Sequence, residues 1–276
     1  MMILDGKKIK NLILDEVKDD VIGLGVKLKL VIIQVGNDNA SDVYVKQKSN
    51  MCNYVGYDFK HIKLDSNVDT EYLVSLINDL NNDESVTGIL VQLPLPSYID
   101  KDKVLNTISC LKDVDGLSNV NKEKLVSLED GLFPCTPVGV MELLDRYSIS
   151  VDSKNVVVIG RSELVGKPLS IMIKNNGGNV TVCHSKTEDI SRYTKKADII
   201  ISAVGKVNLI TGDMVRVGAI VVDVGINSSE NGICGDVDFE SVKDKCSYIT
   251  PVPGGVGPMT VAMLSKNILK AYKLQR

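Results

Sequence analysis

Runs of apolar, mostly β-branched residues recur along the chain, separated by stretches in which apolar residues return every three or four positions. The runs are typical of strands buried on both faces, and the spaced pattern is typical of amphipathic helices. Strands that alternate with helices predict parallel βαβ units, and therefore an α/β fold. Strands are expected at 28–35, 57–64, 87–93, 156–159, 179–183, 198–203, 219–224 and near 248, and helices at 7–21, 40–56, 70–80, 136–147, 164–173 and 259–274.

Local signals suggest where some of these elements begin. Asn39 is a plausible N-cap for the second helix, because its side chain can accept from the first free backbone N–H groups. Thr136 followed by Pro137 fits an N-cap with proline at the first helical position. Residues 118–135 are polar and irregular, so we expect a junction between two domains there.

Composition narrows the class of protein. The 276 residues, 44% hydrophobic and 24% charged, are those of a soluble globular chain of about two domains. A net charge of −3 without a basic cluster argues against a nucleic-acid partner, and no apolar run approaches the ~18 residues of a membrane span. The six cysteines are widely spaced and only two histidines exist, which favours reduced thiols in the cytoplasm over disulfides or a metal site. An acid at position 5 argues against a signal peptide.

The stretch Val156–Pro168 contains the strongest ligand signal in the second half. A buried strand runs directly into Gly160, Arg161 and Ser162 and then into a helix, and such a turn can hold a phosphate at the helix N-terminus. The match to the dinucleotide fingerprint is imperfect, because Ser162 and Val165 occupy the second and third glycine positions. An ordinary βα turn therefore remains an alternative.

The end of the next strand bears on the choice of cofactor. An acid there normally holds the ribose 2′-hydroxyl of NAD, whereas this chain has Cys183-His-Ser185-Lys with no acid. Ser185 together with Arg161 suits a 2′-phosphate, so the pattern favours NADP. Ser185 and Glu188 also form a possible capping box, which is a purely structural alternative.

Four polar residues in the first half are candidates for chemistry. Tyr44 and Lys48 are four residues apart, so they share one face of a helix. Gln92 ends a buried strand just before a Pro-Leu-Pro segment, and Asp115 precedes Gly116 in a loop. Each has a plain alternative: a solvated lysine, a glutamine that satisfies backbone groups, or a turn-capping aspartate.

The order of the motifs resolves these alternatives. The chain strongly resembles the bifunctional methylenetetrahydrofolate dehydrogenase/cyclohydrolase family over essentially its whole length. The segments that carry the resemblance are Tyr44–Lys48, Gly88–Pro96, Lys112–Gly116, Gly160–Pro168 and Pro251–Thr260.

The resemblance implies two α/β domains, an N-terminal folate-binding catalytic domain and a Rossmann-like NADP-binding domain with a cleft between them. The corresponding ranges are 1–119 and 120–258, with the helix of 259–276 packing back onto the first domain. It also implies a homodimer joined through the NADP domain, a folate substrate and a cytoplasmic location.

Site roles follow from the same resemblance. Lys48 is the expected proton-transfer group, and Gln92 is expected to hold its amine in place and favour the neutral form. Asp115, as an anion, suits adjacent N–H donors of the pterin ring, and Tyr44 would stack on the folate. The implied cofactor-binding residues are Gly160, Arg161, Ser162, Ser185 and Ile226, and the implied substrate-binding residues are Tyr44, Lys48, Gln92, Asp115, Pro253, Gly254 and Gly255. No metal is expected.

Two other readings stay open at this point. A related NADP-dependent dehydrogenase of the shikimate or amino-acid type would explain the second half but leave Tyr44, Lys48, Gln92 and Asp115 without a role. A non-catalytic folate- or nucleotide-binding regulator would not need Lys48.

Overall fold

A computed structural model describes residues 1–229 and 232–276, which form two compact units. Unit 1 comprises Met1–Lys10 and Thr136–Thr260, and unit 2 comprises Asn11–Cys135 and Val261–Arg276. Two helices, α1 (Gly6–Leu24) and α10 (Val256–Leu274), run from one unit into the other along the chain. The predicted α/β class with a Rossmann-like sheet is confirmed.

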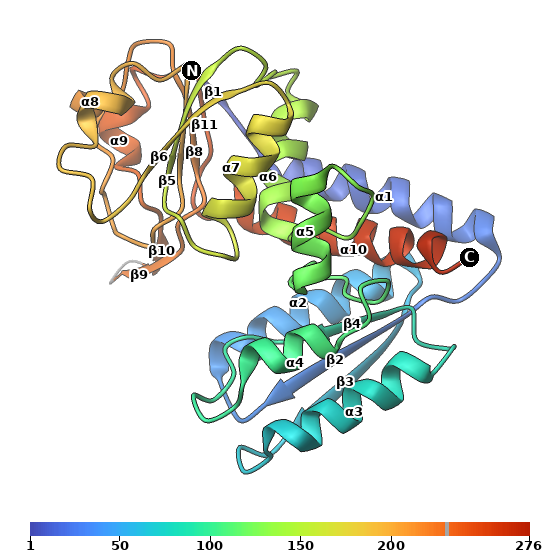
Figure 1. Cartoon of the computed structure of the whole chain (residues 1–276). Helices are drawn as coiled ribbons and strands as arrows, with labels where there is room; N and C mark the ends of the chain where they lie inside the picture. Colours follow the sequence, from blue (N-terminus) through green and yellow to red (C-terminus); the bar gives the residue numbers. More distant parts are fainter. Residues whose placement is uncertain (230–231) are drawn as a thin grey trace. The chain divides into compact units, whose positions relative to one another are not determined.

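Unit 1 is built on a parallel sheet with the strand order β1-β11-β8-β7-β5-β6. Its helices lie on both faces of the sheet, with α6 and α7 on one side and α8 and α9 on the other (Figure 1). The strands are β1 (Met2–Ile3), β5 (Asn155–Ile159), β6 (Asn179–Cys183), β7 (Ile199–Ser202), β8 (Ile220–Asp223) and β11 (Tyr248–Ile249), beside a separate hairpin of β9 (Asn227–Ser229) and β10 (Gly232–Cys234). The helices are α6 (Cys135–Arg146), α7 (Gly166–Asn175), α8 (Ser191–Thr194) and α9 (Phe239–Val242), with a 3-10 turn at Gly212–Met214.

The register of this sheet aligns the carboxyl ends of four neighbouring strands. Ile159 pairs with both Cys183 and Ser202, and Ser202 pairs with Asp223. The carboxyl ends of β5, β6, β7 and β8 are therefore level, which is the edge at which open α/β sheets bind ligands.

Unit 2 has a smaller parallel sheet with the order β3-β2-β4. One face packs on α3 and α4 through a core that includes Val31, Ile33, Ile77 and Val104, and α2 lies on the opposite face (Figure 1). The elements are β2 (Lys29–Val35), α2 (Asn39–Val55), β3 (Asp58–Leu64), α3 (Thr70–Asn82), β4 (Gly88–Val91), α4 (Lys101–Thr107) and α5 (Asn119–Ser127).

Several boundaries differ from those expected. The N-cap of α2 is Asp38 rather than Asn39, since the Asp38 carboxylate accepts from Ser41 N at 2.8 Å. Thr136 is not an N-cap, because α6 already begins at Cys135, and the Thr136 hydroxyl instead bonds the Thr260 hydroxyl at 2.9 Å.

The two units also divide at other positions than the sequence suggested. The segment expected to be irregular contains α5, which stays with unit 2 because Asn121 donates to Cys110 O at 3.0 Å and accepts from Leu132 N at 3.3 Å. The first residues belong to unit 1 because β1 pairs with β11. The chain therefore passes between the units at 10/11, 135/136 and 260/261, where the sequence suggested 119/120 and 258/259.

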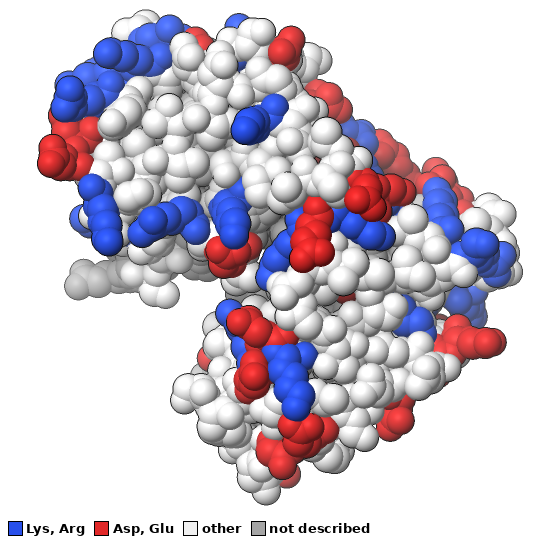
Figure 2. Space-filling model, in the orientation of Figure 1, with Lys and Arg blue, Asp and Glu red and all other residues white. Residues whose placement is uncertain are grey.

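The surface carries mixed charge. On the face drawn in Figure 2, basic and acidic residues are interspersed and separated by broad uncharged areas. Among the helices of the described ranges, 1–229 and 232–276, none combines the length and apolarity that a bilayer crossing needs.

Candidate active site

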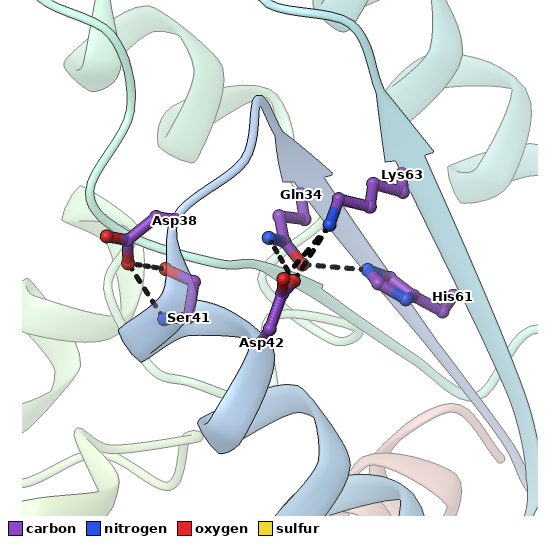
Figure 3. Close-up of polar contacts among 6 residues, drawn as sticks. All are labelled: Gln34, Asp38, Ser41, Asp42, His61 and Lys63. Atoms are coloured by element: carbon purple, nitrogen blue, oxygen red, sulfur yellow. Dashed lines mark hydrogen bonds and ion pairs between the residues drawn. The ribbon is translucent and has the colours of Figure 1, made fainter.

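Helix α2 presents Tyr44 and Lys48, and its ends are well defined. The Asp38 carboxylate caps the N-terminus through Ser41 (Figure 3). Gly56 ends the helix in the left-handed conformation, with φ of 90°. Tyr44 is 40% exposed, so its ring is available to a ligand.

A second set of contacts ties the first turn of α2 to the sheet beneath it. The Asp42 carboxylate accepts from the Gln34 amide at 2.8 Å and from Lys63 Nζ at 3.0 Å (Figure 3). The other end of the Gln34 amide lies 3.0 Å from His61 Nε2. These bonds hold the pKa of the Asp42 carboxyl below its usual range and fix the rotation of the helix that carries Tyr44 and Lys48.

Lys48 reaches from this helix to the end of β4. Its Nζ donates to Gln92 Oε1 at 2.9 Å, and Gln92 Nε2 donates to Leu93 O at 2.8 Å, which leaves the amide oxygen of the buried Gln92 directed at the amine. Burial lowers the pKa of Lys48, and the neighbouring Asp115 carboxylate opposes that shift. The structure thus brings together Lys48, Gln92 and Asp115, three residues that the sequence singled out.

One expectation about this group is wrong. Gln92 was expected to favour the neutral amine, but its oxygen accepts from the amine and so stabilises the ammonium at least as well. Burial is the cause of the lowered pKa, and Gln92 instead fixes the position of the nitrogen.

Asp115 differs from the other two charged residues of its loop, Lys112 and Asp113, whose charged groups bond to the backbone and side chains around them. The adjacent Lys112 donates to the carbonyl oxygens at the end of α3, those of Leu80, Asn81 and Asp83. The adjacent Asp113 accepts from Leu117 N, Ser118 N and Asn121 Nδ2. Burial raises the pKa of Asp115, and the ammonium of Lys48 counters the increase.

Cys135 is a member of this group that the sequence did not indicate. It is buried, its Sγ donates to Val114 O at 3.5 Å next to Asp115, and burial raises the pKa of its thiol well above the usual range. Its surroundings are held by Asn267 of α10, whose amide donates to Val114 O at 2.9 Å and to Phe133 O at 3.0 Å. At neutral pH the thiol is protonated, so it is a hydrogen-bond donor, here to Val114 O, and not a nucleophile.

In unit 1, the turn after β5 is shaped for close backbone approach. Gly160 has φ of 114°, and a Cβ there would lie 2.4 Å from Ala203 O. Ser162 Oγ accepts from Val165 N and Gly166 N, both at 3.3 Å, and α7 begins at Gly166. Leu164, expected in the helix, therefore belongs to the turn. Arg161 is exposed in the same turn, so the turn combines a helix N-terminus with a solvent-exposed positive charge.

Ser185 lies in a turn at the end of β6. The turn is closed by Thr187, whose N donates to His184 O at 2.8 Å and whose hydroxyl accepts from His184 N at 3.0 Å. No helix starts there, since α8 begins at Ser191, so the capping-box alternative for Ser185 and Glu188 is wrong. Ser185 is exposed at the same sheet edge as the Gly160 turn.

The glycine-rich loop after β11 is also tightly built. Gly255 N donates to Pro251 O at 2.8 Å, and Gly254, with φ of 111°, accepts from Lys7 N at 3.0 Å. A Cβ on Gly255 would lie 2.6 Å from Pro251 O, so only glycine fits there. Pro253 is exposed, and so is Ile226, at 51%, in the segment after β8.

Comparison with known proteins identifies this arrangement. Residues 4–115 match the catalytic domain, and residues 134–276 the NAD(P)-binding domain, of tetrahydrofolate dehydrogenase/cyclohydrolase. The chain belongs to the tetrahydrofolate dehydrogenase/cyclohydrolase family.

Individual members of this family are similar over the full length. The bifunctional protein FolD of Campylobacter hominis is 50% identical over 277 residues, covering 99% of this chain and 98% of that protein. The crystal structure of the bifunctional enzyme FolD from Campylobacter jejuni superposes with a TM-score of 0.97 at 49% identity and covers all of both chains. The Trypanosoma brucei dehydrogenase-cyclohydrolase, solved with NADP cofactor and an inhibitor, has a TM-score of 0.94 at 36% identity, covering 100% of this chain and 98% of that one. The resemblance inferred from the motifs is therefore confirmed, and it excludes the shikimate-type alternative.

The two family matches separate the candidate residues in the same way as the two units do. Tyr44, Lys48, Gln92 and Asp115 lie in the catalytic-domain match and in unit 2. The candidate cofactor residues, from Gly160 to Ile226, lie in the NAD(P)-binding match and in unit 1. Across residues 1–229 and 232–276, no group of three His, Cys, Asp or Glu side chains is placed to hold a metal ion.

Proposed function

We propose that this chain oxidises 5,10-methylenetetrahydrofolate to the methenyl form with NADP and then hydrolyses the product to 10-formyltetrahydrofolate. The observation that carries the proposal is the buried Lys48 amine, held 2.9 Å from Gln92 Oε1 beside Asp115. A surface lysine without such partners would not suit proton transfer near neutrality. The family to which the chain belongs supports both activities.

The oxidation needs a positioned cofactor. NADP supplies the hydride acceptor, and removal of hydride from the one-carbon bridge leaves a cation shared by two nitrogens. The chain fits NADP because α7 begins directly after the turn, so the positive end of its dipole would favour a phosphate there, beside the exposed Arg161. The lack of a Cβ at Gly160 and Gly166 lets Ala203 O and Gly160 O pack closely and keeps the turn tight. Gly160, Arg161, Ser162, Ser185 and Ile226 would hold it.

The hydrolysis needs proton transfer at the same carbon. The methenyl cation is already electrophilic, so water adds to it without a metal. Lys48, as a neutral amine, would accept a proton from the attacking water and return it during ring opening. Gln92 would keep the nitrogen in place through both steps.

Binding of the folate would fall to the groups around this amine. Asp115 would accept from adjacent N–H groups of the pterin, and the exposed ring of Tyr44 would stack on the substrate. Pro253, Gly254 and Gly255 complete the proposed substrate-binding set. The exposed Pro253 would supply an apolar contact, and Gly254 and Gly255 hold the loop that carries it in its tight conformation.

We expect NADP to be preferred over NAD. Arg161 and Ser185 are exposed near the same sheet edge, where an acid would be needed for NAD. An arginine–phosphate contact contributes about 1–3 kcal/mol, so Arg161→Ala should narrow the NADP/NAD ratio of kcat/KM by about 10- to 100-fold. Arg192→Ala, another arginine of unit 1, is the control. A wild-type enzyme that uses both cofactors equally would contradict the assignment.

The pH dependence of hydrolysis provides a further test. The active form of Lys48 is neutral, so cyclohydrolase activity should rise with pH through the Lys48 pKa. Since burial lowers that pKa, the midpoint should lie below the ordinary lysine range. Asp115→Asn removes a charge that favours the ammonium, and should move the midpoint to still lower pH. A midpoint that shifts upward in this variant would contradict the pairing of the two groups.

The proposal includes a homodimer and a cytoplasmic location. In the described part of unit 1, β6 is an edge strand with no neighbour on its outer side, and its Val182 is 38% exposed. Such an edge can pair with a second copy. The six free cysteines are compatible with a reducing compartment.

The decisive experiment is an absorbance assay for NADPH with methylenetetrahydrofolate, run with NADP and with NAD. Formation of NADPH, followed by decay of the methenyl product above its spontaneous rate, is expected. A regulator without catalytic activity would bind folate or nucleotide and produce neither signal.

A further inference from the structure

Asp236 follows β10 and is completely buried, and it gathers donors from two loops of unit 1. Its carboxylate accepts five hydrogen bonds, from Ser202 Oγ, Val204 N, Gly205 N, Lys206 N and Asn227 Nδ2. The distances are 2.9, 2.9, 3.3, 2.8 and 3.1 Å in that order. Three consecutive backbone N–H groups thus converge on one side chain, as they do around a bound anion.

The loop held in this way borders the dinucleotide turn. Residues 203–206 follow β7 directly, and a Cβ on Gly160 would lie 2.4 Å from Ala203 O. The loop is therefore packed against the backbone of the turn proposed to hold the pyrophosphate. Val204, at 40%, and Val207, at 46%, are exposed apolar residues of this segment.

The fifth donor links a second loop to the same carboxylate. Asn227 directly follows Ile226, an exposed apolar residue in the segment after β8. Asp236 thereby fixes the loops after β7 and β8 together, and with them Val204 and Ile226. These two side chains lie in segments that follow level strand ends, at the edge where the cofactor would bind.

A second buried carboxylate holds Asp236 itself in place. Asp223 accepts from Gly225 N, Asp236 N and Val237 N at 2.9, 3.0 and 2.8 Å. Neither neighbouring glycine has room for a side chain, since a Cβ on Gly225 would lie 2.1 Å from Asp236 Oδ1 and one on Gly235 would lie 1.9 Å from Asp223 Oδ2. Burial raises the pKa of Asp223 to about 6, so it is mostly ionised at neutral pH and remains an acceptor.

We infer that Asp236 is a positioning residue for NADP, which sets the spacing of the two loops that carry Val204 and Ile226. The inference rests on the proposed dehydrogenase function. The donors to Asp236 come from the end of β7 and from the loops at the ligand-binding edge of the sheet. A carboxylate that served only the core would instead bond to groups within the sheet. An apolar residue at this position would leave three N–H groups without acceptors, and the loop would have to move to satisfy them.

The test is Asp236→Asn, which keeps the shape of the side chain but presents an NH₂ group to N–H donors. The KM for NADP should rise at least about tenfold, and dehydrogenase kcat/KM should fall by about 10- to 100-fold. Hydrolysis of methenyltetrahydrofolate supplied directly should stay within about twofold of wild type, because Lys48 and Gln92, the residues proposed for proton transfer, lie in unit 2 and are not hydrogen-bonded to Asp236. A purely structural role would lower both activities together.

Asp198→Asn is the matched control. Asp198 precedes β7 at the opposite, amino edge of the same sheet, where it accepts from Asn155 N at 2.8 Å and from Arg216 at 2.6 Å. This variant should leave the KM for NADP unchanged. An equal rise of this KM in both variants, or no rise in Asp236→Asn, would overturn the inference.

A milder variant serves if Asp236→Asn does not fold. Asn227→Ala removes one of the five donors and leaves the carboxylate in place, and it should raise the KM for NADP several-fold while hydrolysis is retained. An unchanged KM in Asn227→Ala would then overturn the inference. Failure of the proposed function is distinguishable, since the wild-type chain itself would then form no NADPH.

Discussion

Replacing Lys48 by methionine is expected to lower cyclohydrolase activity by about 10²- to 10⁴-fold, the usual contribution of a positioned proton-transfer group. The variant keeps most of the length and apolar bulk of the side chain and removes the nitrogen that bonds Gln92 Oε1 at 2.9 Å. Dehydrogenase activity should fall less, because hydride removal depends on geometry and on the cofactor. Following NADPH formation and methenyl decay separately in the purified protein measures both effects.

The matched control is Lys46→Met, which makes the same change at an exposed position of the same helix. It should leave both activities near wild type. If both activities fall together in Lys48→Met, the amine also orients the substrate for oxidation. Near-normal methenyl hydrolysis in Lys48→Met would remove this lysine as the catalytic group.

Replacing Asp115 by alanine should weaken folate binding by about 10- to 100-fold and leave NADP affinity nearly unchanged. A hydrogen bond to a charged group contributes about 1.5–3 kcal/mol. The alanine variant would lose more than one such bond, because the Asp115 carboxylate is proposed to accept from several N–H groups of the pterin. Asp115 lies in unit 2, whereas the turn proposed for the pyrophosphate lies in unit 1. Calorimetric titration of each ligand measures the two affinities separately.

Asp79→Ala, on the exposed side of α3, is the control for loss of a carboxylate in the same unit. It should change neither affinity. An Asp115→Ala protein that loses NADP and folate affinity equally would contradict the separation of the two binding sites.

The sequence predicted the elements whose burial pattern is strong and local. The strand expected at 28–35 is β2, which is buried along almost its whole length, as β-branched runs in parallel sheets are. The strand expected at 179–183 is β6, which its alternating valines revealed although, as an edge strand, it is only partly buried. Helix α5 was missed because its residues are mostly polar and only Asn121 and Leu125 are buried. Strand β1 has two residues, and its partner β11 is almost at the other end of the chain, so no local pattern reveals it.

In the candidate site, too, the residues that stand in local motifs could be predicted from the sequence, and those that depend on tertiary contacts could not. Lys48 and Gln92 stand in distinctive motifs, and the structure brings them into contact. Cys135 gave no signal, because its importance comes from packing beside Asp115, and the two are held together partly by Asn267 on a helix much further along. The convergence of loop N–H groups on Asp236 likewise depends on tertiary contacts, which spacing does not encode.

The role of Asn267 has a consequence for how the protein is made. A ribosome releases the chain from its N-terminus, so Lys48 and Asp115 emerge first, while the amide that bonds Val114 O and Phe133 O emerges almost last. All of unit 1, ending at Thr260, is synthesised before the segment Val261–Arg276 that completes unit 2. Since domains fold as units during synthesis, the dinucleotide-binding unit can fold before the final helical segment of the catalytic unit has been synthesised. The catalytic unit, whose segment Asn11–Cys135 precedes most of unit 1 along the chain, is therefore completed after unit 1.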